Sequence, residues 1–255
     1  MTLDLFMLDP AVALDLCRRL VAAAVALSGL ETLSLFRALR PGGSLARPSL
    51  RRHLLLATSA LRFVVGVGLA TALIAPSWHL PALVFLLAAT WWSHASLAYG
   101  NSGADPMIGV VLTALIVGEL VPDSELVQKM VVVTIAGHAT IAYFTTGLTK
   151  ALDARWRSGV YLHTTANSRI FGRSGSLLTD PRHAAVASWI VIIFELIFPI
   201  ALLDPRAAVA LCVAGLLFHL GNALILGLKN FLFAFAATYP AIIATAGLVS
   251  WWIGI

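Results

Sequence analysis

The sequence predicts an all-α fold, a polytopic bundle of about eight transmembrane helices, and leaves an additional interfacial helix open. Hydrophobic residues make up 60% of the 255 residues, and charged residues make up only 11%. Soluble globular domains contain roughly 45–50% apolar and about 25% charged residues. The apolar runs are continuous and do not alternate with polar residues, which disfavours a transmembrane β-barrel. A water-soluble fold is therefore excluded.

Long apolar runs bounded by charged residues, glycine or proline mark the expected spans. They lie at residues 20–36, 54–75, 81–98, 107–121, 127–149, 185–203, 207–228 and 231–253. The longest loop, residues 150–184, is too short for a further domain, so we expect residues 1–255 to form one integral membrane domain with no soluble domain. Within that loop, residues 160–171 mix aromatic, apolar and basic side chains, which suits an interfacial helix and an ordinary surface loop equally well.

The positive charges are unevenly distributed among the loops, although the net charge is only +5. Most of them follow the first, fifth and seventh expected spans, as Arg47 and Arg155 do, and few lie on the opposite side, as Arg18 and Arg206 do. The positive-inside rule then places both termini outside, in a plasma (inner) membrane. Because the basic residues are read as topology markers, we expect the lipid bilayer as a partner and no nucleic acid.

Two cysteines, Cys17 and Cys212, lie far apart in or beside apolar runs. This spacing matches neither a disulfide scaffold nor a zinc site, so the sequence predicts no disulfide and no metal.

Ionisable side chains at membrane depth cost a few kcal/mol each, so each is a candidate functional residue unless it has a structural partner. The candidates are Arg62, His94, Glu119, His138, Lys150, Glu195, His219 and Lys229. Glu119 and Lys229 lie near span ends and can reach water, and the small neighbours of His138 favour a packed core histidine. For Arg62 and Glu195 we expect a structural salt bridge between helices, with a substrate anion site as the alternative.

In three segments the neighbouring residues favour a functional role for the ionisable side chain. Near Trp91, Trp92 and Ser93, the imidazole of His94 lies among indoles and hydroxyls that can line a flat aromatic ligand. Lys150 follows an apolar run at the membrane edge, where partial burial favours a neutral amine that can act as a base.

The third segment combines His219 and Asn222, which are three residues apart and therefore share one helix face. Each of the three segments also has a purely structural interpretation, because tryptophan and lysine commonly anchor helices at the membrane interface.

The same three segments resemble the vitamin K-dependent gamma-carboxylase family, whose membrane part is shared with the bacterial HTTM proteins. The carboxylases have a Trp-x-x-His segment before a Tyr-Gly pair, and residues 91–100 are similar to it. They also have a Tyr-Phe-x-x-Gly-x-x-Lys-x-Leu-Asp-x-x-Trp-x-x-Gly stretch, which residues 143–159 match closely. A third motif, Phe-His-x-x-Asn before a phenylalanine-rich span, resembles residues 218–222 and 230–233.

The resemblance implies a membrane enzyme that uses a reduced quinone, O2 and CO2, without a metal. In the family, a lysine base deprotonates the reduced quinone, whose reaction with oxygen gives a base strong enough to remove a substrate proton, with an epoxide as by-product. By position, Lys150 would be that base, His94 would handle the substrate proton or carbanion, and His219 would complete the catalytic set. The residues that would line the quinone pocket are Trp91, Trp92, Ser93, Tyr99, Trp156 and Asn222.

Two departures from the family pattern matter. Ser93 stands where the carboxylases have an asparagine beside the histidine. The large lumenal domain that presents glutamates in the carboxylases has no counterpart in this sequence, so carboxylation of a protein would require a substrate-presenting subunit. One alternative is a non-catalytic HTTM-type protein that assists maturation, export or immunity of a partner. A transporter is a weaker alternative, because no inverted repeat is evident.

Overall fold

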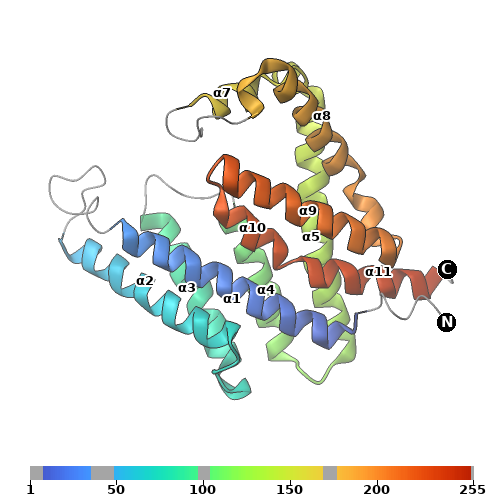
Figure 1. Ribbon diagram of the computed structural model, residues 1–255. Helices are drawn as coiled ribbons and strands as arrows, with labels where there is room; N and C mark the ends of the chain where they lie inside the picture. Colours follow the sequence, from blue (N-terminus) through green and yellow to red (C-terminus); the bar gives the residue numbers. More distant parts are fainter. Residues whose placement is uncertain (1–7, 36–48, 97–103, 169–176, 254–255) are drawn as a thin grey trace. The chain divides into compact units, whose positions relative to one another are not determined.

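The computed structural model describes residues 8–35, 49–96, 104–168 and 177–253, and these residues form helices and turns without any strand (Figure 1). The longer helices are α1 (Pro10–Ser34), α2 (Ser49–Ala70), α3 (His79–Ser96), α4 (Asp105–Leu120), α5 (Glu125–Leu152), α8 (Pro181–Ile197), α9 (Pro205–Ile225) and α11 (Tyr239–Ile253). The shorter ones are α6 (Ala154–Arg157), α7 (Val160–Ala166), α10 (Lys229–Ala236) and the 3-10 helices η2 (Pro76–Trp78), η3 (Leu177–Thr179) and η4 (Phe198–Leu202). The all-α prediction is confirmed.

Each expected span overlaps a helix of the described chain, and five helical segments are long and apolar enough to cross a membrane. These are Leu50–Ala70, Glu125–Leu152, Pro181–Leu202, Pro205–Ile225 and Lys229–Ile253. Of the others, α4 has only 16 residues, and α1 carries Asp15, Arg18 and Arg19 in its first half. The protein is thus a polytopic helical membrane protein, and the number of eight crossings stays a prediction.

Aspartate caps define where several helices begin. Asp9, Asp180 and Asp204 each precede a proline, and each accepts a hydrogen bond from a backbone N–H of the first turn. Proline fits the first helical position because that turn does not use its missing N–H. The helix that contains the expected span at residues 20–36 therefore begins well before the span itself. The Asp9–Pro10 cap starts α1 ten residues earlier, and the polar residues of its first half remain helical.

The described part of the loop expected over residues 150–184 contains more helix than predicted. Helix α5 continues to Leu152, and α6 and α7 follow within the loop. Within residues 160–171 the chain is helical from Val160 to Ala166 (α7), with Val160 and Tyr161 exposed, and the interfacial position of this helix stays a prediction. Arg169, the basic residue of that segment, lies outside the described residues.

The chain forms two compact units. The first comprises Asp9–Ile135 and Phe233–Ala241, and so contains α1 to α4 and the start of α5. The second comprises Ala136–Leu232 together with the part of α11 from Ile242 onwards. We describe each unit by itself.

Helices α1 and α2 of the first unit pack at backbone distance over two glycines. A Cβ atom at Gly29 would lie 2.7 Å from the carbonyl oxygen of Ser59, and one at Gly66 would lie 2.7 Å from that of Ala22. Such small residues allow helices to approach closely in membranes, where dispersion contacts replace the hydrophobic effect between helices.

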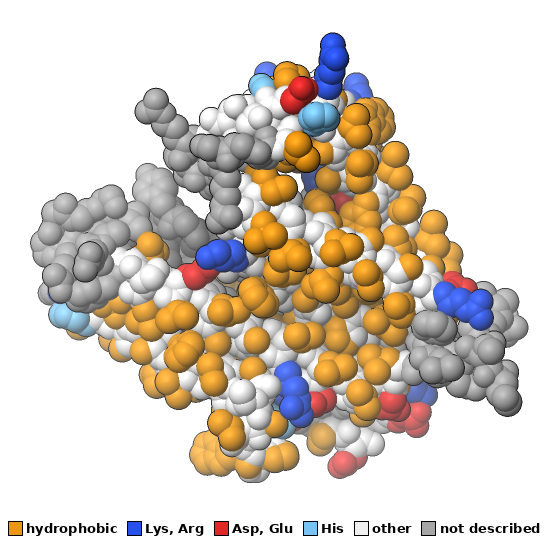
Figure 2. Space-filling model, viewed as in Figure 1, with side chains coloured by type: hydrophobic (Ala, Val, Ile, Leu, Met, Phe, Trp, Pro, Cys, Tyr) orange, Lys and Arg blue, Asp and Glu red, His pale blue; other side chains and the backbone are white. Residues whose placement is uncertain are grey.

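Large apolar side chains cover much of the described surface (Figure 2). Examples are Leu61 and Val64 on α2, Ile190 and Ile193 on α8 and Leu217 on α9, all exposed to the surroundings. Soluble monomers rarely present apolar surface on this scale, whereas lipid contact requires it. These side chains are therefore the bilayer-facing surface of the protein.

We predict that Gly29→Ala destabilises the first unit by about 1–3 kcal/mol, because the added methyl group forces α1 and α2 apart. The measurement is equilibrium unfolding of the purified protein in mixed micelles. Gly137→Ala is the matched control, since no described atom beyond its own helix lies within 4 Å of its added Cβ. Equal stability of the two variants would refute backbone-distance packing at Gly29.

Candidate functional site

The candidate site in the second unit is built on one face of α5. Tyr143, Gly147 and Lys150 are spaced four and three residues apart, so they lie on the same face of the helix. At 28 residues, α5 is about 42 Å long, which exceeds the roughly 30 Å hydrocarbon core of a bilayer. Lys150, two residues before the helix ends, is therefore well placed at the edge of the hydrocarbon region.

Lys150 forms an ion pair with Glu195 of α8. The Lys150 Nζ donates a hydrogen bond to Glu195 Oε1 at 2.5 Å, and the two side chains are only 14% and 5% exposed. Glu195 Oε2 is buried and has no hydrogen-bond partner among the described residues. Removing two charges from water is expensive, and a buried pair loses several kcal/mol when either partner is deleted. The two residues therefore depend on each other.

Gly147 makes this pairing possible. A Cβ atom at this position would lie 2.8 Å from the Glu195 Cβ and 3.0 Å from the backbone nitrogen of Leu196. Only a residue without a side chain lets α5 and α8 come this close. The glycine thus sets the helix separation that brings the lysine and the glutamate within hydrogen-bonding distance.

The turn that follows α5 brings an indole ring over the lysine. Asp153 ends the helix and caps α6 by accepting a hydrogen bond from Arg155 N at 2.7 Å. Trp156 of α6 then lies with its ring centre 4.9 Å from the Lys150 Nζ, within the range of a cation–π contact. The Trp156 carbonyl accepts a 2.5 Å hydrogen bond from Ser188 of α8, which holds the turn against that helix.

Gly159 completes the turn. Its φ of +75° is a left-handed backbone conformation that favours glycine, and a Cβ there would lie 2.4 Å from Ala185 N. The motif of residues 143–159 thus contains residues with separate physical roles, namely Gly147, Lys150, Asp153, Trp156 and Gly159. Two glycines set close approaches, the aspartate caps a helix, and the lysine and tryptophan face one another.

A cavity of about 350 Å3 opens beside this group, lined by Thr145, Thr146, Thr149, Lys150 and Trp156. Each threonine hydroxyl donates a hydrogen bond to a carbonyl of the preceding helical turn, which uses its only proton. Their oxygens therefore remain as acceptors along the cavity wall. The volume is at the lower end of the range typical of small-molecule sites.

A second polar contact of this unit lies among aromatic rings. The Tyr143 hydroxyl and the Nε2 of His219 are hydrogen-bonded at 2.7 Å, and His219 is 3% exposed. Tyr143 stacks on Phe198 with a centroid distance of 3.9 Å, and His219 stacks on Phe231. A hydrogen bond enclosed in this way fixes both rings. Asn222 lies one turn further along α9, where its carbonyl accepts the hydrogen bonds from Leu226 N and Leu228 N that end the helix.

His138 of the second unit is exposed, so the expectation of a packed core histidine was wrong.

The first unit contains the other residues that we predicted to form the site. His94 Nδ1 lies 3.3 Å from Asp105 Oδ2, and the Trp91 ring approaches the imidazole edge-on at 5.9 Å. Ser93 accepts a 3.0 Å hydrogen bond from Arg62, whereas Trp92 is exposed. Tyr99 lies outside the described residues.

The structure thus groups Lys150 with Trp156 in one unit and His94 with Trp91 in the other. It also changes one predicted pairing. Glu195 pairs with Lys150, whereas Arg62 donates to Ser93 and, at 3.1 Å, to Ser28. The serines were overlooked because a buried arginine suggests a carboxylate, although hydroxyl oxygens also satisfy its donors.

The sequence did not predict the residues that pair with the three catalytic candidates. Tyr143 pairs with His219, Asp105 with His94 and Glu195 with Lys150. Tyr143 carried a signal, because it lies seven residues before Lys150 on the same helix face. Within the described ranges, no group of three or more His, Cys, Asp or Glu side chains is arranged to hold a metal ion.

A family model described as the HTTM domain matches residues 119–246, half of the chain. The match includes Lys150, Trp156, Glu195 and His219, and it excludes the Trp91–His94 segment. No curated protein and no solved structure shows significant similarity to the chain.

We predict that Glu195→Ala lowers the free energy of unfolding by about 3–5 kcal/mol, because it leaves a buried ammonium without a partner. The double variant Lys150→Met/Glu195→Leu removes both charges and should recover most of that loss. Equilibrium unfolding in mixed micelles measures both effects. A single variant as stable as the unaltered protein would show that the ion pair does not hold α5 against α8.

Proposed function

The chain belongs to the HTTM family, and from that premise we propose that it is a membrane enzyme that binds a reduced quinone beside Lys150. The observation that carries the proposal is the buried Lys150–Glu195 pair at the wall of a cavity. Burying a lysine costs free energy, so a buried lysine in a membrane protein is a candidate functional residue. Its partner here, Glu195, is a carboxylate that can accept its proton.

The residues present fit a quinone ring. Trp156 offers an aromatic face, and the threonine oxygens of the cavity wall are hydrogen-bond acceptors for hydroxyl groups. When bound, a reduced quinone would supply, with O2, an oxygen base much stronger than any side chain, able to remove a proton from a carbon acid for reaction with CO2. No metal is needed for that chemistry.

Lys150 would act as a general base through its contact with Glu195. Transfer of a proton from Nζ to Oε1 over the 2.5 Å hydrogen bond leaves a neutral amine and a neutral carboxylic acid, so the net charge of the pair does not change. The amine then has a lone pair that can accept a proton from a hydroxyl in the cavity. This sequence avoids a net charge in a low-dielectric site, which would be costly.

The two histidines have separate roles in this proposal. His219, fixed by Tyr143 among aromatic rings, would line the reaction space together with Asn222. His94, oriented by Asp105, would exchange the substrate proton, with Trp91, Trp92 and Ser93 beside it. The carbon-acid substrate would come from the membrane or from a substrate-presenting protein subunit.

We predict that Lys150→Ala abolishes hydroquinone-dependent epoxide formation, a loss of at least about 100-fold, typical of removing a general base. The assay uses the purified protein with a reduced naphthoquinone and O2. Lys129→Ala is the control, because Lys129 pairs with Glu125 on the surface and does not line the cavity. Normal turnover by the Lys150 variant would contradict the assignment, and no turnover by the unaltered protein would favour a non-catalytic role.

The charge distribution further predicts that the Lys150 end of α5 faces the cytoplasm of a plasma membrane. Arg155→Cys should then be protected from an impermeant maleimide on intact cells, and Arg206→Cys should be labelled. Both arginines are exposed, and the native Cys17 and Cys212 are buried and give little background. Labelling of the Arg155 variant alone would reverse the orientation.

A further inference from the structure

A second polar cavity lies at the other end of the first unit from His94. It measures about 510 Å3 and is lined by the first half of α1, the end of α4 and the starts of α3 and α5. His79 begins α3 and His94 lies 15 residues later, which separates the two ends by about 22 Å along the helix. The cavity is therefore distinct from the surroundings of His94.

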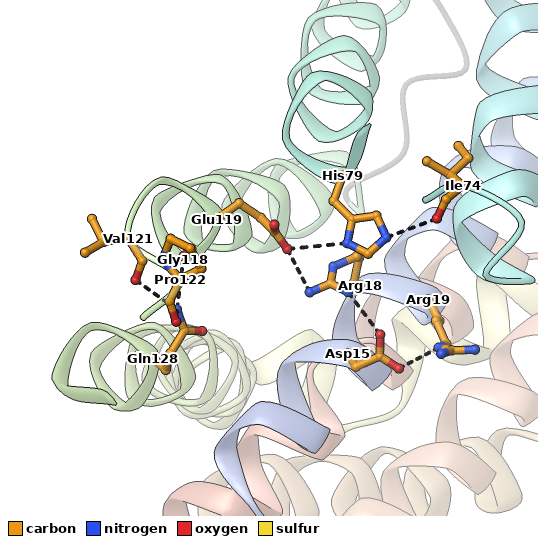
Figure 3. A network of polar contacts seen from close by, with 10 residues as sticks. All are labelled: Asp15, Arg18, Arg19, Ile74, His79, Gly118, Glu119, Val121, Pro122 and Gln128. Atoms are coloured by element: carbon orange, nitrogen blue, oxygen red, sulfur yellow. Dashed lines mark hydrogen bonds and ion pairs between the residues drawn. The ribbon is translucent and has the colours of Figure 1, made fainter. Parts of the chain in front are cut away.

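Charges of both signs face this cavity (Figure 3). The guanidinium of Arg18 contacts Asp15 at 3.0 Å and Glu119 at 2.8 Å, and Arg19 Nε contacts the second oxygen of Asp15 at 2.6 Å. His79 Nδ1 lies 3.8 Å from Glu119, and its Nε2 lies 3.3 Å from the carbonyl of Ile74. Two guanidinium groups and two carboxylates from α1 and α4 thus lie beside the imidazole at the start of α3.

The network does not use all of its hydrogen-bonding capacity internally. Arg18 Nε is buried and has no hydrogen-bond partner in the part of the chain that the structure describes. Arg19 uses Nε for Asp15, and its side chain remains 42% exposed. The cavity can therefore offer guanidinium donors to an anion and carboxylate oxygens to a cation at the same time.

The cavity wall is held in place by a fixed turn. The Gln128 side-chain amide donates to the carbonyls of Gly118, Val121 and Pro122 at 3.0, 3.3 and 3.4 Å. These contacts hold the turn between α4 and α5, next to Glu119 (Figure 3). Such a wall needs little rearrangement when a ligand binds, which reduces the entropic cost of binding.

An apolar groove adjoins the polar cavity, and Ile74 lines both. The groove measures about 430 Å3, and its other lining residues include Val65, Leu73, Trp78, Pro81 and Phe85. Trp78 is 64% exposed, as expected for an interfacial tryptophan. A charged cavity that shares the wall residue Ile74 with an apolar groove is complementary to an amphiphile with a charged head and a hydrocarbon chain.

We propose that this cavity and groove together bind one membrane phospholipid whose headgroup carries a phosphate diester and a primary ammonium. The phosphate would contact the terminal nitrogens of Arg19, the ammonium would contact Asp15 and Glu119, and an acyl chain would occupy the groove past Trp78. A quaternary ammonium cannot donate the hydrogen bonds that the carboxylates accept, and a glycerol headgroup brings no cation for them. The site is independent of Lys150 and of the proposed quinone chemistry.

The test measures binding of phospholipids to the purified full chain in neutral detergent by native mass spectrometry. Three lipids with the same acyl chains carry ethanolamine, choline or glycerol headgroups, and soluble phosphoethanolamine is the fourth ligand. We expect the ethanolamine lipid to bind at least tenfold more tightly than each of the others. Equal binding of the three lipids would overturn the headgroup assignment, and equal binding of soluble phosphoethanolamine would overturn the role of the groove.

Matched variants locate the site. Arg19→Ala and Trp78→Ala should each weaken binding of the ethanolamine lipid at least fivefold. Lys129→Ala and Trp252→Ala should leave it unchanged, because these residues are similarly exposed but line neither the cavity nor the groove. Both test positions lie at the surface, and thermal unfolding of each variant verifies its fold. Unchanged binding in folded Arg19→Ala and Trp78→Ala variants would refute the proposal.

Discussion

The ion pair between Lys150 and Glu195 is the interaction on which the second unit depends. The Lys150 Nζ and the Glu195 Oε1 are 2.5 Å apart, and both side chains are largely buried. Loss of either partner would leave an uncompensated buried charge, which costs several kcal/mol of stability. The surrounding motif serves this contact: Gly147 lets α5 and α8 approach, and the Asp153 cap turns the chain so that Trp156 covers the amine. Gly159 then packs against the backbone of Ala184 and Ala185 in the first turns of α8. The motif is therefore a device for holding one buried amine.

The helical fold could be predicted largely from composition. Continuous apolar runs identify spans, and Asp-Pro pairs identify the starts of α1, α8 and α9 once they are interpreted as caps. The extension of α1 to Pro10 was missed because hydropathy treats Asp15 and Arg18 as span limits. In the structure these side chains neutralise one another and remain helical. Hydropathy thus locates apolar segments, whereas capping and ion pairing decide where helices begin.

The site could be predicted only in part. Lys150 and Trp156 are six residues apart, so a single turn can bring them together, and their contact follows from local sequence. Glu195 is forty-five residues from its partner, and several intramembrane bases could have paired with it. Which base it meets is decided by the close approach at Gly147, a tertiary constraint that periodicity does not encode. The polar cavity at Arg18 was missed for the same reason, because its charges come from different helices.

Infrared difference spectroscopy tests the central claim, that Lys150 and Glu195 act together as a proton acceptor, most directly. The spectrum is recorded as a reduced naphthoquinone is added without oxygen, so that turnover cannot proceed. The account predicts a new carbonyl band of a protonated carboxylic acid, which is absent from the Glu195→Gln variant and from Lys150→Met. A spectrum with no such band, or with the same band in the Glu195→Gln variant, would contradict it.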